Sequence, residues 1–62
     1  MKTIMFKNKD GYSVYVRLAD VRAVEGHSEG CLIMMNDGTG ELLLQSSEPA
    51  VEVWKKWVEA MK

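Results

Sequence analysis

The chain has 62 residues, of which 47% are hydrophobic and 27% charged, and its formal net charge is −1. This length allows one small domain, the apolar content argues against disorder, and the balanced charge argues against a strongly basic protein that binds nucleic acid or membranes. The one cysteine, Cys31, excludes an internal disulfide, and together with the lack of a signal peptide this predicts a cytoplasmic protein. The apolar runs are too short to span a membrane, so we expect no membrane insertion.

Two alternating segments at the start of the chain predict a β-hairpin. In residues 1–9, Ile4 and Phe6 occupy one face of a strand, and residues 12–18 alternate in the same way. The turn between them, residues 8–11, ends in a glycine that suits a tight connection. We therefore expect the first two strands of the domain here.

The middle of the chain predicts one helical turn followed by more strands. Val21 and Val24 are three residues apart, which suits a single helical turn capped by Asp20. Turns that contain glycine, at residues 28–30 and 37–40, separate short apolar segments. These segments predict three further strands, at residues 23–27, 31–36 and 41–45.

The end of the chain predicts an amphipathic helix over residues 47–62. The Ser46–Ser47 pair offers caps, and Pro49 fits the first helical position. The helical period places the large apolar side chains on one stripe. The stripe consists of Val51, Trp54, Trp57, Val58 and Met61. We expect this stripe, both tryptophans included, in the core, and an ion pair between Glu52 and Lys56 on the opposite face.

These elements predict a single α+β domain in which a β-meander of four to five strands, residues 1–45, carries the helix on one face. Register across the turn at residues 37–40 pairs Asn36 with Glu41 and fixes which side chains share a face. The expected core residues on the strands are Ile4, Phe6, Val14, Val16, Ile33, Met35, Leu42 and Leu44. The far face of the sheet carries Met5, Tyr15, Leu32, Met34 and Leu43.

The five apolar side chains on the far face are the main indication of function. The single helix cannot cover that face, and exposed apolar patches usually mark interfaces. A core of this size supplies only about 3–5 kcal/mol, so a second copy or a protein partner on the far face would stabilise the domain. The alternative is that the sheet curls and buries part of the five. We therefore expect a small non-enzymatic protein-interaction or regulatory module, with a homodimer as its favoured state.

The balanced net charge conceals a segregation of charge along the chain. Residues 1–22 carry +3, residues 23–49 carry −5 and residues 50–62 carry +1. The basic first hairpin, with an aromatic residue between cations, could bind single-stranded nucleic acid. The residues for that function are Lys7, Tyr15 and Arg17. Because the acidic middle would repel a phosphate chain, nucleic-acid binding is the alternative, and oriented contact between protein surfaces is favoured.

Four residues near the middle of the chain could carry chemistry. Glu25, His27 and Glu29 alternate and could bind a metal, but the neighbouring glycines favour a solvated polar turn. His27 and Cys31 could form a thiol–imidazole pair, but no third group orients it, and a small buried role suits Cys31 better. We therefore expect no enzyme activity, no metal and no cofactor.

Several short motifs are similar to those of a known family. They are Asp10-Gly11, Leu18-Ala19-Asp20-Val21, Ala23-Val24-Glu25, Cys31-Leu32-Ile33, Asp37-Gly38 and Ser46-Ser47-Glu48. In this order and chain length, the sequence resembles the small FlbD/SwrD-type proteins of bacterial flagellar operons. The resemblance implies a cytoplasmic, non-enzymatic accessory protein that acts through protein contacts near the flagellar machinery. The Asp20–Glu25 step also resembles a LytTR domain, the final strands and helix resemble a pleckstrin-like edge, and a phage product that blocks a host complex is a further analogy.

Overall fold

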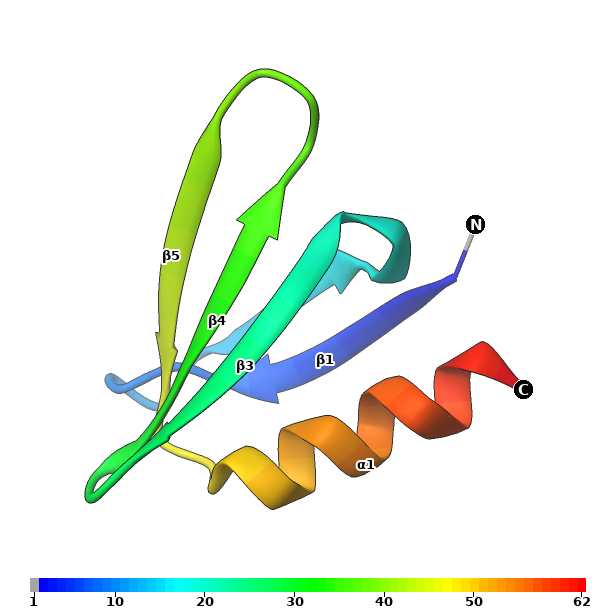
Figure 1. The fold of residues 1–62 in the computed structure, drawn as a ribbon. Coiled ribbons are helices and arrows are strands. Elements are labelled where there is room, and N and C mark those ends of the chain that lie inside the picture. The colour runs from blue at the N-terminus through cyan, green and yellow to red at the C-terminus, as the bar shows by residue number, and fades with distance from the viewer. Residues whose placement is uncertain (1) are drawn as a thin grey trace.

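The computed structural model describes residues 2–62 as five strands, one short 3₁₀ turn and one helix (Figure 1). The elements are β1 (Thr3–Lys7), β2 (Ser13–Arg17), η1 (Leu18–Asp20), β3 (Val21–His27), β4 (Gly30–Asn36), β5 (Glu41–Ser46) and α1 (Ala50–Met61). The strands form two antiparallel sheets, a β1–β2 hairpin and a β3–β4–β5 meander. The predicted α+β class with a C-terminal helix is confirmed, with the strands divided between two sheets. In this part of the chain, no helix has the length and apolar character needed to cross a membrane.

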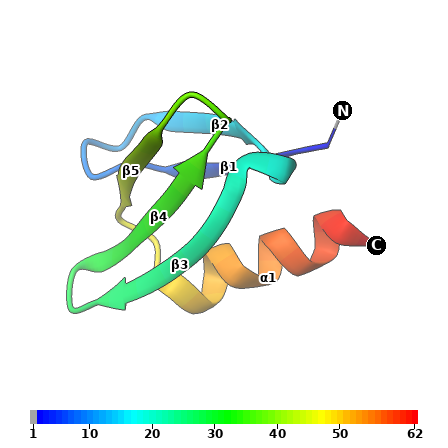
Figure 2. The same ribbon diagram turned by 45° about the horizontal axis from the view of Figure 1, so that its top comes forward.

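The two sheets join at a corner where β1 ends beside the end of β5. Asn8 forms a bridge with Ser46, and the Ser47 amide donates to the Lys7 carbonyl oxygen at 3.1 Å. The Ser46 hydroxyl donates to the same oxygen at 2.7 Å and accepts from the Glu48 amide at 3.0 Å. Because the sheets join at this corner, they curve around a shared interior, and α1 lies across the open side between β1 and β3 (Figure 2).

The prediction that Ser46 and Ser47 cap the helix is wrong. Both serines are engaged in the junction between the sheets. The helix begins at Ala50, three residues later than predicted, with Pro49 as its N-cap and without a side-chain capping bond. The pyrrolidine ring of Pro49 sets φ at −60°, which suits the turn into the helix.

The ion pair expected within the helix is replaced by one that reaches outside it. Lys56 Nζ lies 2.7 Å from the Glu48 carboxylate and donates to the Met5 carbonyl oxygen at 2.9 Å, so the predicted Glu52–Lys56 pair is not formed. The Glu48 carboxylate also accepts from the Lys7 amide at 2.7 Å. These contacts tie the polar side of α1 to β1 and limit how the helix can rotate about its axis.

Side chains from both sheets and the helix share one core. The buried hydrophobic residues are Ile4, Phe6, Val16, Val21, Cys31, Ile33, Met35 and Val53. The predicted pairing of Asn36 with Glu41 is confirmed, and the strand residues predicted for the core are buried or half-buried, except Leu42. Leu42 is 55% exposed because it lies near the β4–β5 turn, which projects away from the helix (Figure 1).

The helical turn in the middle of the chain comes earlier than predicted. It is the 3₁₀ turn η1, and Val21 already begins β3 and is buried. The Leu18 amide donates to the Lys2 carbonyl oxygen at 2.9 Å, and the Asp20 carboxylate pairs with Arg17 at 2.8 Å. Asp20 therefore closes the turn that precedes it and does not cap a helix that follows.

The apolar residues of α1 fall into two rows, of which one packs into the core. The inner row is Ala50, Val53, Trp57 and Ala60, and the side chain of Val53 is fully buried. The outer row is Val51, Trp54, Val58 and Met61, all of which are exposed. The prediction that the outer row packs in the core is therefore wrong, whereas Trp57 does pack against the core. A Cβ on Gly26 would lie 3.3 Å from the Ala50 Cβ, so small residues at this contact allow α1 to lie close to β3.

Candidate functional site

The five residues predicted for a single interface lie on two different sheets. Met5 and Tyr15 are paired across the β1–β2 hairpin, and Met34 is paired with Leu43 across β4 and β5, with Leu32 on the same side. Most of their neighbours along each strand point into the shared core, so these five point away from it on separate sheets, with Leu32 and Met34 half-buried. The structure thus gathers them into two small groups, and their role in an interface stays a prediction.

The three residues predicted for nucleic-acid contact share the outer face of the β1–β2 hairpin. Tyr15 is 72% exposed, between the positions of Lys7 and Arg17. The Arg17 guanidinium is paired with Asp20 at 2.8 Å, and Lys7 Nζ donates to the Ser13 hydroxyl at 2.9 Å. Because one of the two cations is already paired with a carboxylate, this face offers little net charge to a phosphate chain.

The residues considered for catalysis or metal binding lie around the β3–β4 turn, where His27, Glu29 and Cys31 line one small cavity. Cys31 is buried as predicted, and burial raises the pKa of its thiol, an effect that a hydrogen bond with Ser46 opposes only in part. His27 is opposite Gly30 and exposed, and its Nε2 lies 3.2 Å from the Glu25 carboxylate. Across residues 2–62, no three side chains of His, Cys, Asp or Glu are grouped to hold a metal ion. This part of the molecule therefore presents a solvated polar turn beside a buried thiol.

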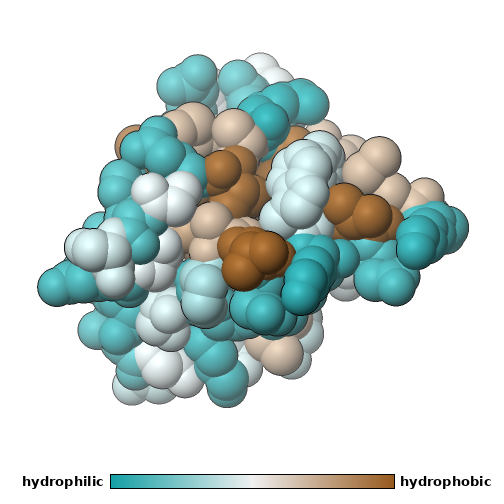
Figure 3. Space-filling view, turned by 60° about the horizontal axis from the view of Figure 1, so that its bottom comes forward, coloured by the Kyte–Doolittle hydropathy of each residue, from teal (hydrophilic) through white to brown (hydrophobic). Residues whose placement is uncertain are grey.

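The outer row of α1 is an apolar surface that folding of one copy leaves exposed. Trp54 is 47% exposed. The centroids of the Trp54 and Trp57 rings are 4.6 Å apart, and the angle between the ring planes is 55°. Because Trp57 packs against the core, this contact holds Trp54 in place on the surface. Figure 3 shows the helix side of the molecule, where hydrophobic side chains are exposed between hydrophilic ones. A rigid aromatic side chain with apolar neighbours is typical of the centre of a protein interface.

The charged residues of α1 and its flanks form ion pairs of opposite sign. Lys55 lies 3.9 Å from Glu52, and Lys62 lies 3.7 Å from Glu59. The remaining helix cation, Lys56, is paired with Glu48. The outer row is therefore bordered by paired charges of both signs.

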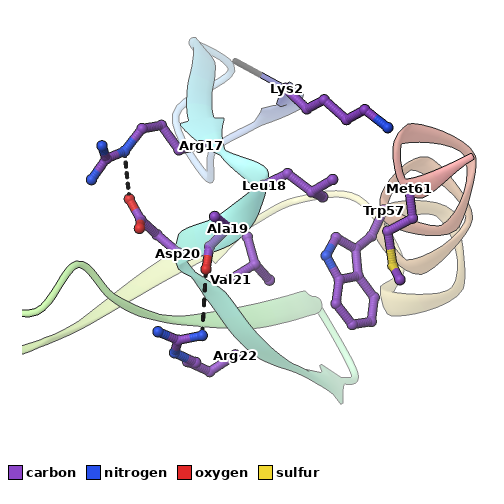
Figure 4. Close-up of a pocket in the computed structure, with 9 residues that line it drawn as sticks. All are labelled: Lys2, Arg17, Leu18, Ala19, Asp20, Val21, Arg22, Trp57 and Met61. Carbon is purple, nitrogen blue, oxygen red and sulfur yellow. Dashed lines mark hydrogen bonds and ion pairs between the residues drawn. The ribbon is translucent and has the colours of Figure 1, made fainter.

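A groove lies beside the outer row, between η1, the start of β3 and the end of α1 (Figure 4). Its volume is about 600 Å³. The apolar residues that line it are Leu18, Ala19, Val21, Trp57 and Met61. The charged residues that line it are Lys2, Arg17, Asp20 and Arg22. Met61 belongs both to the outer row and to this groove, which we call the η1 groove, so the two surfaces are continuous.

Sequence reasoning missed both surfaces because it placed the large apolar residues of the helix in the core. A signal was nevertheless available, since apolar residues at the inner-row and outer-row positions together cover about half of the helix circumference at 100° per residue. Such a width exceeds what one small sheet can bury. Periodicity alone could not decide which part of this wide face would remain exposed.

Comparison with known proteins identified no significantly similar protein. The chain matches no protein-family model, and neither a curated protein nor a solved structure matches it significantly. The resemblance to FlbD/SwrD-type proteins accordingly stays a prediction.

Proposed function

We propose that this chain is a small non-enzymatic protein–protein interaction module that self-associates through the outer row of α1. The observation that carries the proposal is the exposure of Trp54, held by its contact with Trp57, among other apolar residues of the outer row. Large apolar side chains grouped in this way are costly to leave in water, because full burial of each contributes about 1.5–3 kcal/mol. A partner that covers them would therefore bind.

Charge and stability favour a second copy as that partner. With the Lys56–Glu48, Glu52–Lys55 and Glu59–Lys62 pairs, residues 48–62 carry no net charge that would repel a second copy. A core this small supplies only about 3–5 kcal/mol, so burial of the outer row would add substantially to the free energy of unfolding. A standard dimer takes about 800 Å² from each partner, just under a fifth of the 4302 Å² of accessible surface. The interface would therefore extend beyond the outer row onto its polar neighbours, with Trp54 near its centre.

The order of residues in the outer row is compatible with a two-fold axis. Antiparallel packing of two copies of α1 would set Val51 against Met61 of the other copy and Trp54 against Val58. Each contact is then made twice, as an isologous dimer requires.

The test is the molar mass in solution, measured by size-exclusion chromatography with light scattering over a range of protein concentrations. We expect a dimer for the unchanged chain and a monomer for Trp54→Glu, with the same helix content by circular dichroism. Tyr15→Glu is the matched control, because it puts the same charge in place of an exposed aromatic residue on the β1–β2 hairpin. A monomer at high concentration contradicts the proposal, and so does a dimer that Tyr15→Glu or Leu43→Glu dissociates and Trp54→Glu does not.

Binding of single-stranded nucleic acid is the second candidate function. It is favoured by the strong exposure of Tyr15 on the hairpin face that also carries Lys7 and Arg17. If this function holds, a labelled oligothymidine should bind at low salt, binding should weaken as salt rises, and Tyr15→Ala should reduce it. Absence of binding at low salt would exclude this function.

The biological setting of the module follows from the resemblance alone. A cytoplasmic accessory protein of the flagellar type and a phage-encoded protein that binds a host complex are both compatible with a small self-associating domain. Genes that neighbour the coding sequence, flagellar or prophage, would discriminate between these settings.

A further inference from the structure

We infer that the η1 groove binds an acidic peptide segment of another protein, which inserts an apolar side chain between Leu18 and Trp57. This inference goes beyond self-association, because it assigns the groove an occupant different from the one proposed for the outer row. It depends on the shape of the groove, on its apolar lining and on the charges around it.

The groove can accept a large side chain. Its volume of about 600 Å³ lies within the range of about 300–1,000 Å³ that is typical of ligand-binding pockets. Val21 forms a buried part of the lining, and Leu18 and Trp57 are half-buried, so their positions are set by the core. In Figure 4 the Trp57 ring and the Met61 side chain lie on one side of the groove and Leu18 on the other. The flexible Met61 thioether can adapt to the occupant.

The charges at the groove are predominantly positive. Three cations, Lys2, Arg17 and Arg22, line it with one carboxylate, Asp20, and that carboxylate is paired with Arg17. Arg22 is exposed and forms none of the ion pairs found in residues 2–62. Among residues 2–62 its guanidinium donates to the backbone oxygens of Ala19 and Asn36, both at 3.4 Å, which are long bonds. A carboxylate from outside would make a shorter, charge-assisted bond here.

These features favour an acidic peptide over a nucleic acid. A phosphate chain needs a row of cations along its path, whereas this groove has an apolar lining. Of the three cations that line it within residues 2–62, Arg17 is paired with Asp20, and Lys2 Nζ already donates to the Lys62 oxygen at 3.4 Å. An acidic segment with one or two large apolar residues matches both the lining and the charges. The β4–β5 turn of a second copy, with Asp37, Glu41 and the exposed Leu42, has a similar composition and is therefore the competitor that the test must separate.

The test uses two fluorescein-labelled synthetic peptides of ten residues. One has aspartate and glutamate around a central Leu-Phe pair, and the other has lysine in place of each acidic residue. Fluorescence anisotropy should show binding of the acidic peptide, at least about tenfold weaker binding of the lysine peptide, and weakening with salt. In a Trp54→Phe variant, Trp57 is the remaining tryptophan, so a shift of its emission on binding would report that the peptide enters the groove.

Substitutions then locate the binding site. Arg22→Glu should weaken binding of the acidic peptide about tenfold or more, and Leu18→Ala should weaken it severalfold. Lys9→Glu is the matched control, because it makes a similar charge change on an exposed residue outside the groove and should have a much smaller effect. Circular dichroism of each variant establishes that the fold is retained.

Three results with the peptides and the oligothymidine would overturn the inference. They are equal affinity for both peptides, binding that Arg22→Glu leaves unchanged, and preferential binding of an oligothymidine that Arg22→Glu abolishes. Concentration-dependent association of the chain that Arg22→Glu removes would show a second copy in the groove and would also overturn it. Failure of the self-association proposal is distinct, because it leaves a monomer whose peptide binding still depends on Arg22.

Discussion

The inner and outer rows of α1 are both apolar and lie side by side on one helix, yet only the inner row packs against the core. The inner row contains two alanines, whereas the outer row contains Trp54 and Met61. Each row also contains one tryptophan, so the outer row is on average the larger of the two although it is exposed. Burial in this small domain is therefore decided by how closely the helix can approach the sheets, and hydrophobicity alone does not predict it.

Two contacts determine which row of α1 packs against the core. At the start of the helix, Ala50 lies against Gly26 of β3, where a Cβ on Gly26 would lie 3.3 Å from the Ala50 Cβ, closer than ordinary van der Waals contact. On the polar side, Lys56 is held by Glu48 and by the Met5 carbonyl oxygen. Rotation of the helix to bury Trp54 would break the contacts of Lys56 with Glu48 and the Met5 oxygen. It would also bring larger side chains against Gly26. The outer row is exposed because of these restraints, which makes it available to a partner.

The largest effect should come from placing the same charge in each row. Val53→Asp puts a carboxylate at a position that is 0% exposed, where an unpaired buried charge costs about 3–5 kcal/mol. That cost is comparable to the whole stability of a domain of this size. We expect Val53→Asp to be unfolded at 25 °C by circular dichroism.

Val51→Asp is the matched variant in the outer row. Val51 is 57% exposed and lies in the same turn of the helix, so the free energy of unfolding of the monomer should change by no more than about 0.5 kcal/mol. Urea denaturation at a concentration that keeps both proteins monomeric would measure the difference. Equal destabilisation by the two substitutions would mean that the rows do not differ in burial.

An intermediate effect should come from enlarging the contact between helix and sheet. Gly26→Val adds a Cβ 3.3 Å from the Ala50 Cβ and further methyl groups beyond it, so we expect a loss of about 1–3 kcal/mol from overpacking. The urea midpoint would measure this loss. Ala23→Val, at an exposed position of the same strand, should change stability little.

A double substitution tests whether the loss arises at the contact itself. Ala50→Gly removes the methyl group that the new side chain meets, so Gly26→Val and Ala50→Gly together should destabilise less than the sum of the two separate changes. Strict additivity would place the cause elsewhere in β3.

The strands were predictable because their signals are local. Alternation of residues such as Ile4 and Phe6 marks a half-buried strand, and the turn before Glu41 fixes its register opposite Asn36. The division into two sheets was not predictable, because it depends on Ser46 reaching the Lys7 carbonyl oxygen, a contact between residues 39 positions apart. No pattern within a short window encodes such a contact.

The candidate site was less predictable than the fold. The helical period identified Trp54 as apolar and on one side of the helix, but the rotation of the helix depends on the Gly26–Ala50 contact and on the Lys56–Glu48 pair. The η1 groove forms where η1, β3 and the end of α1 meet, so it exists only after the chain has folded. The sequence places Arg22 in a basic segment, without any indication that it borders an apolar groove.

The smallest effect on stability should come from loss of the Glu48–Lys56 ion pair. This pair helps to set the rotation of α1 that buries the inner row and exposes the outer row. Burial raises the pKa of Glu48, but hydrogen bonds from Lys56 Nζ and the Lys7 amide outweigh burial and leave this pKa below its ordinary value of 4.5. The folded state therefore binds the proton less readily than the unfolded state. The stabilisation is present above pH 4.5 and is lost as the pH falls below that value.

We expect this contribution to be no more than about 1 kcal/mol, because both side chains retain contact with water. The Asp37 pKa is also lowered, chiefly by a hydrogen bond from the Thr39 side chain, so the measurement belongs in an Asp37→Asn background. There, the difference in urea midpoint between pH 7 and pH 3.5 should be smaller for Glu48→Gln than for the chain that retains Glu48. An unchanged difference would show that the pair does not stabilise the fold, and the restraint on helix rotation would then rest on the contact between Gly26 and Ala50.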